Sequence, residues 1–152
     1  MLFNSSRLRS GFTLLELVIV VAIIAVLASL VAPNLVRHAS DAKVQAARSQ
    51  IELLGLALEA FHLDVDDYPL SDEGLQALRV RPSDEDRARL WRGPYLKREV
   101  PVDPWGRSYV YRFPGQLDST SFELLTTGRD GLPGGTGDAR DITSWESGTR
   151  AR

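Results

Sequence analysis

The apolar residues near the start of the chain form one long run. From Phe12 to Ala32 the 21 residues are apolar almost throughout, and Glu16 is the one strongly polar residue among them. An α-helix rises about 1.5 Å per residue, so a helix over this run is about 30 Å long, the hydrocarbon thickness of a bilayer. The pattern predicts a helix that can cross a membrane, and it leaves one acid to be explained.

The spacing of the apolar residues changes after Pro33. From Val44 to Phe61 they recur at intervals of three and four, which is typical of one face of an α-helix. Charged residues fall between them, so this half of the helix needs a partner on one side only. We predict a single helix from Phe12 to about Leu63, loosened at Pro33 because proline lacks the N–H that the helix ladder uses.

A turn and a short helix are expected after the long helix. The acidic residues beside Tyr68 are typical of a solvated turn rather than of a metal cluster. The segment "SDEGLQAL", residues 71–78, predicts a short helix with its leucines facing inward. The residues concerned are Asp64, Asp66 and Asp67 in the turn, Ser71 or Asp72 as the helix cap, and Leu75 and Leu78 on the inner face.

The following segments predict a polar connection and then a small sheet. Residues 79–92 alternate in charge, which favours a surface loop or short helix with Leu90 and Trp91 folded back onto the core. A turn at 103–106, over which Trp105 is expected to pack, precedes an alternating run at 109–113 that is typical of a half-buried strand. After a turn at Pro114-Gly115, residues 121–127 predict a second strand. The expected fold class is α+β, with the long helix packed on a small antiparallel sheet.

A glycine-rich loop follows the second predicted strand. Residues 128–141 contain five glycines and three aspartates, a composition that excludes regular helix or strand and makes an untethered loop mobile. A calcium ion would order it, because carboxylates and main-chain carbonyls are the oxygen ligands that Ca²⁺ prefers. The candidate carboxylates are Asp130 with Asp138 or Asp141. An exposed loop without an ion fits the same composition.

Composition excludes several classes of function. A net charge of −2 and the absence of a basic cluster argue against nucleic-acid binding. The chain has no cysteine, which removes disulfides, thiolate metal sites and cysteine nucleophiles. His38 and His62 are isolated, so neither is expected to bind metal. No nucleophile, base and orienting group can be identified, and we do not expect an enzyme.

The basic leader and the apolar run that follows it allow three interpretations. The leader carries Arg7 and Arg9 and no acid, which is typical of a cytoplasmic flank. A secretory signal cleaved after Ala28 would have a shorter apolar core without Glu16. A plain membrane anchor fits the length but leaves Glu16 unexplained, since an acid inside a spanning helix costs roughly 2 to 3 kcal/mol.

The third interpretation accounts for the acid. The segment "GFTLLE", residues 11–16, resembles the cleavage motif of type IV prepilins and type II secretion pseudopilins. The resemblance implies that a prepilin peptidase cuts after Gly11 and that Phe12 becomes the N-methylated first residue. It also implies an assembly role for Glu16, because the ammonium group created in one subunit can pair with this carboxylate in a neighbour.

The rest of the chain extends the resemblance. The segments "GPYLK", "VPVDPWGRSYVY" and "TTGRDGLPGGTGDARDI" are similar to the major pseudopilins of type II secretion systems, and with the N-terminal motif the similarity runs from residue 9 to residue 145. It implies a type IV pilin-like fold with a calcium ion in the C-terminal loop, held by two aspartates and main-chain carbonyls. Asp130 matches the first aspartate, Thr127 and Leu132 are the carbonyl candidates, and Asp138 is preferred to Asp141 as the second aspartate.

The resemblance also implies an organisation and a location. Residues 1–11 are the cleaved leader, residues 12–33 a transmembrane or filament-core helix, and residues 34–152 a periplasmic domain. The expected protein crosses a bacterial inner membrane once, with its N-terminus in the cytoplasm. After processing by the prepilin peptidase it polymerises with itself into a periplasmic pseudopilus that drives folded proteins across the outer membrane. Its other expected partners are minor pseudopilins and the inner-membrane platform.

Two other functions remain alternatives at this point. A type IV pilin has the same class of fold, but many pilins close their last loop with a disulfide, and this chain has no cysteine. A membrane-tethered, calcium-dependent binding module would keep residues 1–11 uncut.

Overall fold

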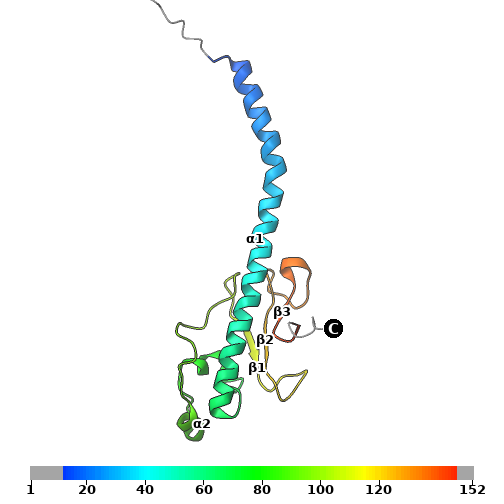
Figure 1. Ribbon diagram of the computed structural model, residues 1–152. Coiled ribbons are helices and arrows are strands. Elements are labelled where there is room, and N and C mark those ends of the chain that lie inside the picture. The colour runs from blue at the N-terminus through cyan, green and yellow to red at the C-terminus, as the bar shows by residue number, and fades with distance from the viewer. Residues whose placement is uncertain (1–11, 147–152) are drawn as a thin grey trace, which may run out of the picture. The chain divides into compact units, whose positions relative to one another are not determined.

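The computed structural model describes residues 12–146, without the side chains of residues 30–37. The chain divides into two compact units, residues 1–39 and residues 40–152, and helix α1 contributes to both (Figure 1). The expected leader, with Gly11, lies outside the described residues, so its predicted cleavage stays a prediction.

Helix α1 spans Leu14–Val65, and the predicted helix is therefore confirmed to within two residues at each end. Thr13 opens the helix, because its Oγ1 accepts a hydrogen bond of 3.2 Å from the backbone N–H of Glu16. The helix ends where Asp66 turns to a positive φ of 63°. The predicted turn is confirmed for Asp66 and Asp67, whereas Asp64 belongs to the last turn of α1.

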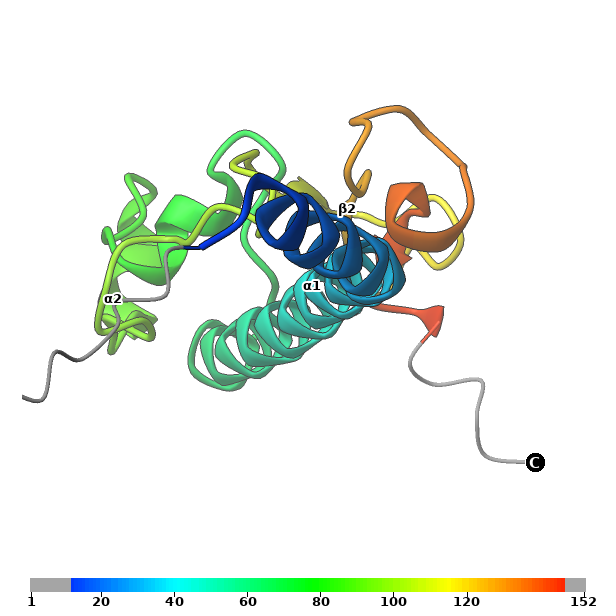
Figure 2. The same ribbon diagram turned by 90° about the horizontal axis from the view of Figure 1, so that it is seen from above.

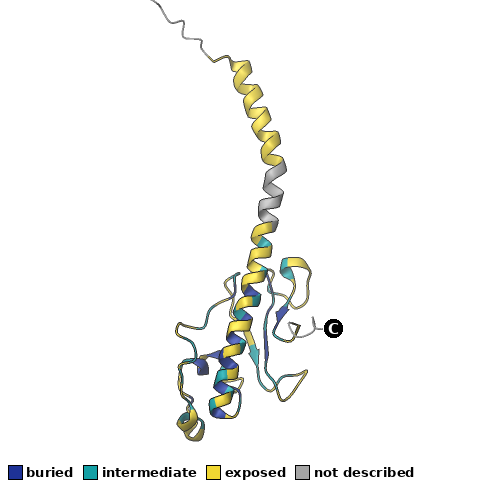
Figure 3. Cartoon of the chain, in the orientation of Figure 1, coloured by how far each residue is buried: buried dark blue, intermediate teal, exposed yellow. Residues whose placement is uncertain are grey.

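The part of α1 before residue 30 exposes large apolar side chains on all sides. Twelve of them between Phe12 and Leu27 are at least 42% exposed, from Val20 at 42% to Leu14 at 80% (Figure 3). In the part of the chain that the structure describes, no helix is long and apolar enough to span a membrane. The transmembrane assignment of residues 12–33 is therefore not confirmed and stays a prediction.

The second unit is built on one face of α1. Leu54, Leu58 and Phe61 are at most 1% exposed and pack against Leu78 and Leu124, which are fully buried. The dark stripe in Figure 3 follows this side of the helix. The three-and-four spacing of the apolar residues correctly predicted which face of α1 forms the core.

Three short antiparallel strands form the sheet in the order β1-β2-β3. Strands β1 (Val110–Arg112) and β2 (Glu123–Thr126) lie within the two predicted strands, with Tyr111 opposite Leu124. Strand β3 (Ile142–Thr143) was not predicted, because it has only two residues and follows the glycine-rich loop directly. It pairs with β2, so both ends of the loop are anchored on one strand.

The short helix at residues 71–78 is a 3₁₀ helix, η1, spanning Gly74–Leu78. Leu75 and Leu78 are buried as predicted. The predicted caps are wrong, because Glu73 precedes η1 and makes no side-chain cap hydrogen bond. Ser71 is used elsewhere: its Oγ donates to the carbonyl of Phe113 at 2.7 Å and accepts from the N–H of Phe113 at 2.8 Å.

The polar segment contains one short helix, α2, spanning Glu85–Leu90. Asp84 caps it by accepting from the N–H of Arg87 at 2.9 Å. Trp91 packs against the core as predicted and donates from Nε1 to the carbonyl of Ala77 at 3.0 Å. The expectation for Leu90 is wrong, since it is 47% exposed at the end of a helix with no buried residue.

Tyrosine hydroxyls join α1 to the rest of this unit. Tyr68 donates to Glu59 at 2.8 Å, and Tyr95 donates to Asp64 at 2.9 Å. Burial raises the pKa of the Tyr68 phenol to about 12, and the hydrogen bond to Glu59 acts in the same direction. Burial also raises the pKa values of Tyr95, Tyr109 and Tyr111.

Adjacent leucines of α1 provide a test of this packing. Leu54→Ala should lower the free energy of unfolding by roughly 3 kcal/mol, because Leu54 is 1% exposed and its removal leaves a cavity. Leu53→Ala on the same helix should change it by less than about 0.5 kcal/mol, because Leu53 is 62% exposed. Urea unfolding followed by tryptophan fluorescence measures both. Equal effects of the two substitutions would contradict the assigned core face.

The tyrosines predict a loss of stability in alkali. Their folded-state pKa values lie above the unfolded value of about 10, so the folded state holds protons that the unfolded state releases. Stability should be complete below about pH 10 and fall as the pH rises towards 12. Urea unfolding at a series of pH values measures this slope, and Tyr68→Phe should reduce it. A stability that stays constant from pH 9 to 12 would contradict the burial of these hydroxyls.

Candidate metal site in the C-terminal loop

The glycine-rich loop leaves β2 at Thr126 and returns to it through β3. Figure 2 shows its orange segment arching outward beyond β2. All five glycines of residues 128–141 have positive φ, between 62° and 93°. Gly128 has a second constraint, since a Cβ there would lie 2.7 Å from the carbonyl oxygen of Arg140 and 2.8 Å from that of Asp138. The loop therefore folds tightly on itself, and a side chain at Gly128 would open it.

Backbone hydrogen bonds close the loop. The N–H of Arg129 donates to the carbonyl of Asp138 at 2.8 Å, and the N–H of Asp141 donates to the carbonyl of Gly134 at 3.1 Å. A 3₁₀ turn, η2, spans Gly137–Ala139 between these contacts. The prediction that residues 128–141 form no regular helix is correct except for this single 3₁₀ turn.

Asp138 is already engaged by two polar side chains. Its Oδ2 accepts from the hydroxyl of Ser40 on α1 at 2.5 Å and lies 3.4 Å from Nη1 of Arg129. Both contacts are made to the same oxygen of the carboxylate. Asp138 therefore links the loop to α1 within the second unit.

Asp141 is in a different position. Its Oδ2 accepts from the N–H of Gly134 at 3.0 Å, whereas its Oδ1 is buried and has no hydrogen-bond partner among the described residues. A buried carboxylate oxygen without a hydrogen-bond donor is unfavourable, and a bound cation would satisfy it. The Oδ1 of Asp141 is therefore available to a metal ion. The carboxylate and carbonyl oxygens of the loop are donors that fit a hard cation.

The remaining predicted ligands flank the start of the loop. Asp130 is exposed, and its Oδ1 accepts from the N–H of Leu132 at 3.1 Å. Within the part of the chain that is described, no hydrogen bond is made to the carbonyls of Thr127 or Leu132. Both carbonyls thus keep the lone pairs that a cation needs.

A site made of side chains alone is not present in the described residues, because no three His, Cys, Asp or Glu side chains come together. An ion in the loop would depend on main-chain carbonyls as well as on carboxylates. His62, expected to be no ligand, lies with its ring stacked on that of Tyr68 at 4.4 Å.

Two residues that sequence patterns did not single out reach the loop. Ser40 precedes Asp138 by 98 residues, and Arg107 hydrogen-bonds to carbonyls of Gly128 and Arg129. Contacts between residues so far apart in the sequence leave no local pattern from which they could be predicted. The composition of "DPWGR" indicated only a turn.

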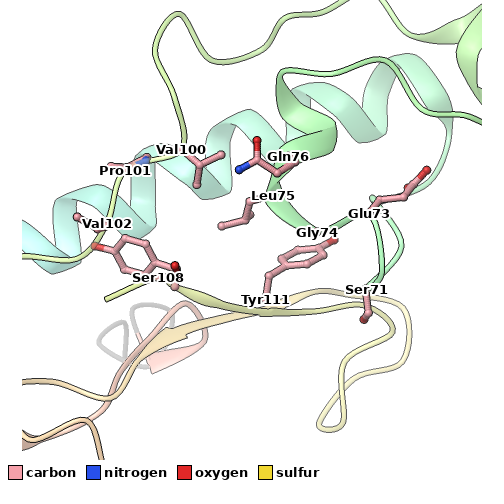
Figure 4. A pocket seen from close by; sticks show the side chains of 11 residues that line it. Ser71, Glu73, Gly74, Leu75, Gln76, Val100, Pro101, Val102, Ser108 and Tyr111 are labelled. Atoms are coloured by element: carbon pink, nitrogen blue, oxygen red, sulfur yellow. The ribbon is translucent and has the colours of Figure 1, made fainter. Parts of the chain in front are cut away.

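A groove of about 300 Å³ lies elsewhere in the second unit (Figure 4). It is lined by η1, residues 100–102 and β1, with Leu75 projecting into it beside Tyr111. Its tyrosine hydroxyls are used structurally, since Tyr109 donates to Gln50 and Tyr111 donates to the carbonyl of Pro69. Burial raises the pKa values of both phenols, so both hydroxyls remain protonated well into the alkaline range.

Comparison with known families covers almost the whole chain. The model of type II secretion system protein G matches residues 34–145, and the model of the prokaryotic N-terminal methylation motif matches residues 6–32.

Individual relatives agree with the family models. The type II secretion system core protein G of Vibrio cholerae is 42% identical over 139 residues, covering 91% of this chain and 93% of the relative. The protein of the same name from Escherichia coli K12 is 43% identical over 138 residues, covering 90% and 91%. The crystal structure of the major pseudopilin of enterohaemorrhagic Escherichia coli has 34% identity and a TM-score of 0.60, covering 75% of this chain and 96% of that one.

Proposed function

The chain belongs to the type II secretion system protein G family, and we propose that it is the major pseudopilin of such a system. It acts as a structural subunit, polymerising into a periplasmic pseudopilus that drives folded proteins across the outer membrane. The observation that carries this proposal is the order of two matches, an N-terminal methylation motif followed directly by the protein G module. This family favours protein secretion over the type IV pilin alternative.

Processing begins the assembly. A prepilin peptidase cuts between Gly11 and Phe12 on the cytoplasmic side, and Phe12 is then methylated. Only Phe12 and Thr13 then precede α1, so the new ammonium group lies next to a helix N-terminus. The partial positive charge there disfavours a cation and favours the carboxylate of Glu16 in the first turn. Glu16 is therefore placed where positive charge accumulates.

The exposed apolar surface of α1 fits a subunit that lies first in the inner membrane and then in the filament. The side chains from Phe12 to Leu27 favour lipid or other helices around them, because contact between apolar surface and water is unfavourable. Before assembly, residues 12–33 cross the inner membrane with the N-terminus in the cytoplasm. After extraction the same side chains pack against those of neighbouring subunits, which provides the cohesion of the filament.

Partners follow from this location. Besides the peptidase and other copies of the chain, the subunit meets minor pseudopilins and the inner-membrane platform of the secretion system. A membrane-tethered binding module would instead retain its leader and remain monomeric.

We further infer that the C-terminal loop holds a calcium ion. Asp130 and Asp141 supply the carboxylates, and Thr127 and Leu132 supply carbonyls. The support for Asp141 over Asp138 is the buried Oδ1 of Asp141, which has no partner among the described residues, whereas Oδ2 of Asp138 is engaged by both Ser40 and Arg129. The bound ion supplies positive charge and fixed coordination to a loop that otherwise lacks a core.

The pairing of Glu16 predicts an assembly defect without an insertion defect. Glu16→Gln should insert normally but lower filament yield by about tenfold or more, since an unpaired buried charge costs about 3 kcal/mol. Carbonate extraction of membranes measures insertion, and immunoblotting of sheared filaments measures assembly. Glu52→Gln, an exposed site on the same helix, is the control. Normal filament yield from Glu16→Gln would contradict the pairing.

Calcium should raise the melting temperature of the detergent-solubilised chain relative to chelator, because an ion bound only by the folded state stabilises it by about 2.7 kcal/mol at 100 times its Kd. Asp130→Asn and Asp141→Asn should abolish this rise. Asp138→Asn should lower the melting temperature with and without calcium while keeping the rise. Loss of the rise in Asp138→Asn alone would reverse the assignment, and no rise in the unmodified chain would remove the ion.

A further inference from the structure

A buried carboxylate organises the turn that precedes β1. Asp103 is 2% exposed, and its Oδ1 accepts from the N–H groups of Trp105 and Arg107 at 3.0 and 2.8 Å. Its Oδ2 accepts from the hydroxyl of Thr126, the last residue of β2. The backbone of Arg107 is therefore fixed to the strand from which the C-terminal loop departs.

The side chain of Arg107 extends from this turn into the loop. Its Nη1 donates to the carbonyl of Gly128 at 2.8 Å, and its Nη2 donates to the carbonyl of Arg129 at 3.0 Å. A Cβ at Gly131 would lie 2.7 Å from Nε of Arg107, so the guanidinium group occupies space that a side chain there would take. One planar group thus binds two consecutive carbonyls at the start of the loop and lies against Gly131.

The two carbonyls bound by Arg107 lie between two of the proposed calcium ligands. Gly128 and Arg129 directly follow Thr127 and directly precede Asp130. Fixing their peptide planes fixes the starting point of Asp130. It also restrains the backbone of Gly128, which is the residue next to the Thr127 carbonyl. The planar fork of arginine can hold both carbonyls at once, whereas the ammonium of lysine lacks this geometry.

We propose that Arg107 is a positioning residue that preorganises the calcium site, an inference that rests on the proposed binding of calcium. Within the described part of the chain its side chain donates hydrogen bonds to Gly128 and Arg129 and to none of the proposed ligand atoms. Its effect on affinity comes from ordering the segment before the ion arrives. The positive charge of Arg107 also repels a divalent cation. The direction in which calcium affinity changes when Arg107 is removed therefore distinguishes preorganisation from repulsion. Preorganisation predicts that removing Arg107 weakens calcium binding, whereas simple repulsion predicts that removal strengthens it.

The test measures calcium affinity of the full chain in detergent by isothermal titration calorimetry. Arg107→Gln removes the charge and the fork and should raise the Kd for calcium by about tenfold or more, the usual effect of losing a group that orients ligands. Arg107→Lys keeps the charge and should rescue binding only in part. Arg98→Gln, an exposed arginine outside the turn and the loop, removes one positive charge as the control and should change the Kd less than about twofold.

A second readout does not depend on the ion. In chelator, the backbone amides of residues 128–134 should exchange with deuterium faster in Arg107→Gln than in the unmodified chain, while those of α1 residues 50–61 should be unchanged. Unaltered exchange in the loop, or a Kd that stays the same or falls in Arg107→Gln, would overturn the proposal. An unmodified chain that binds no calcium overturns the proposed ion itself, and faster exchange in the variant would then leave Arg107 as a clamp of an ion-free loop.

Discussion

Helix α1 has two apolar surfaces whose exposure to water is unfavourable, and the rest of the structure depends on how each of them is buried. From Leu54 to Phe61 one face is covered by η1 and the sheet, so this part folds within a single chain. From Phe12 to Leu27 every side is apolar and exposed. One helix thus joins a folded domain to a segment that requires lipid or further copies of itself, which is the requirement of a membrane-stored filament subunit.

Two sets of polar contacts hold the C-terminal loop within the second unit. In the second unit Asp103 and Arg107 connect the turn before β1 with the loop after β2, and Ser40 with Asp138 connects that loop with α1. Because both loop ends are anchored on β2, few further contacts are needed to order the glycine-rich segment. The proposed calcium ion adds to a loop that protein groups already hold on two sides.

Periodic features of the fold were predictable from sequence, and contacts across long separations were not. The three-and-four spacing predicted α1 and its buried face, and alternation predicted β1 and β2. Strand β3 has too few residues to show a pattern, and Ser71 bonds to Phe113 instead of capping η1, because tertiary partners displaced a local preference. The choice between Asp138 and Asp141 depends on which carboxylate oxygen lacks a donor, and spacing contains no such information.

In the proposed filament, proteolysis before the apolar helix creates the positive charge that Glu16 needs. Mass spectrometry of the N-terminal peptide, taken from filaments sheared from secreting cells, tests it directly. If the amine pairs with Glu16 as proposed, the chain begins at Phe12 and carries a methyl group on its amine. Filaments built from chains that retain residues 1–11 would contradict it.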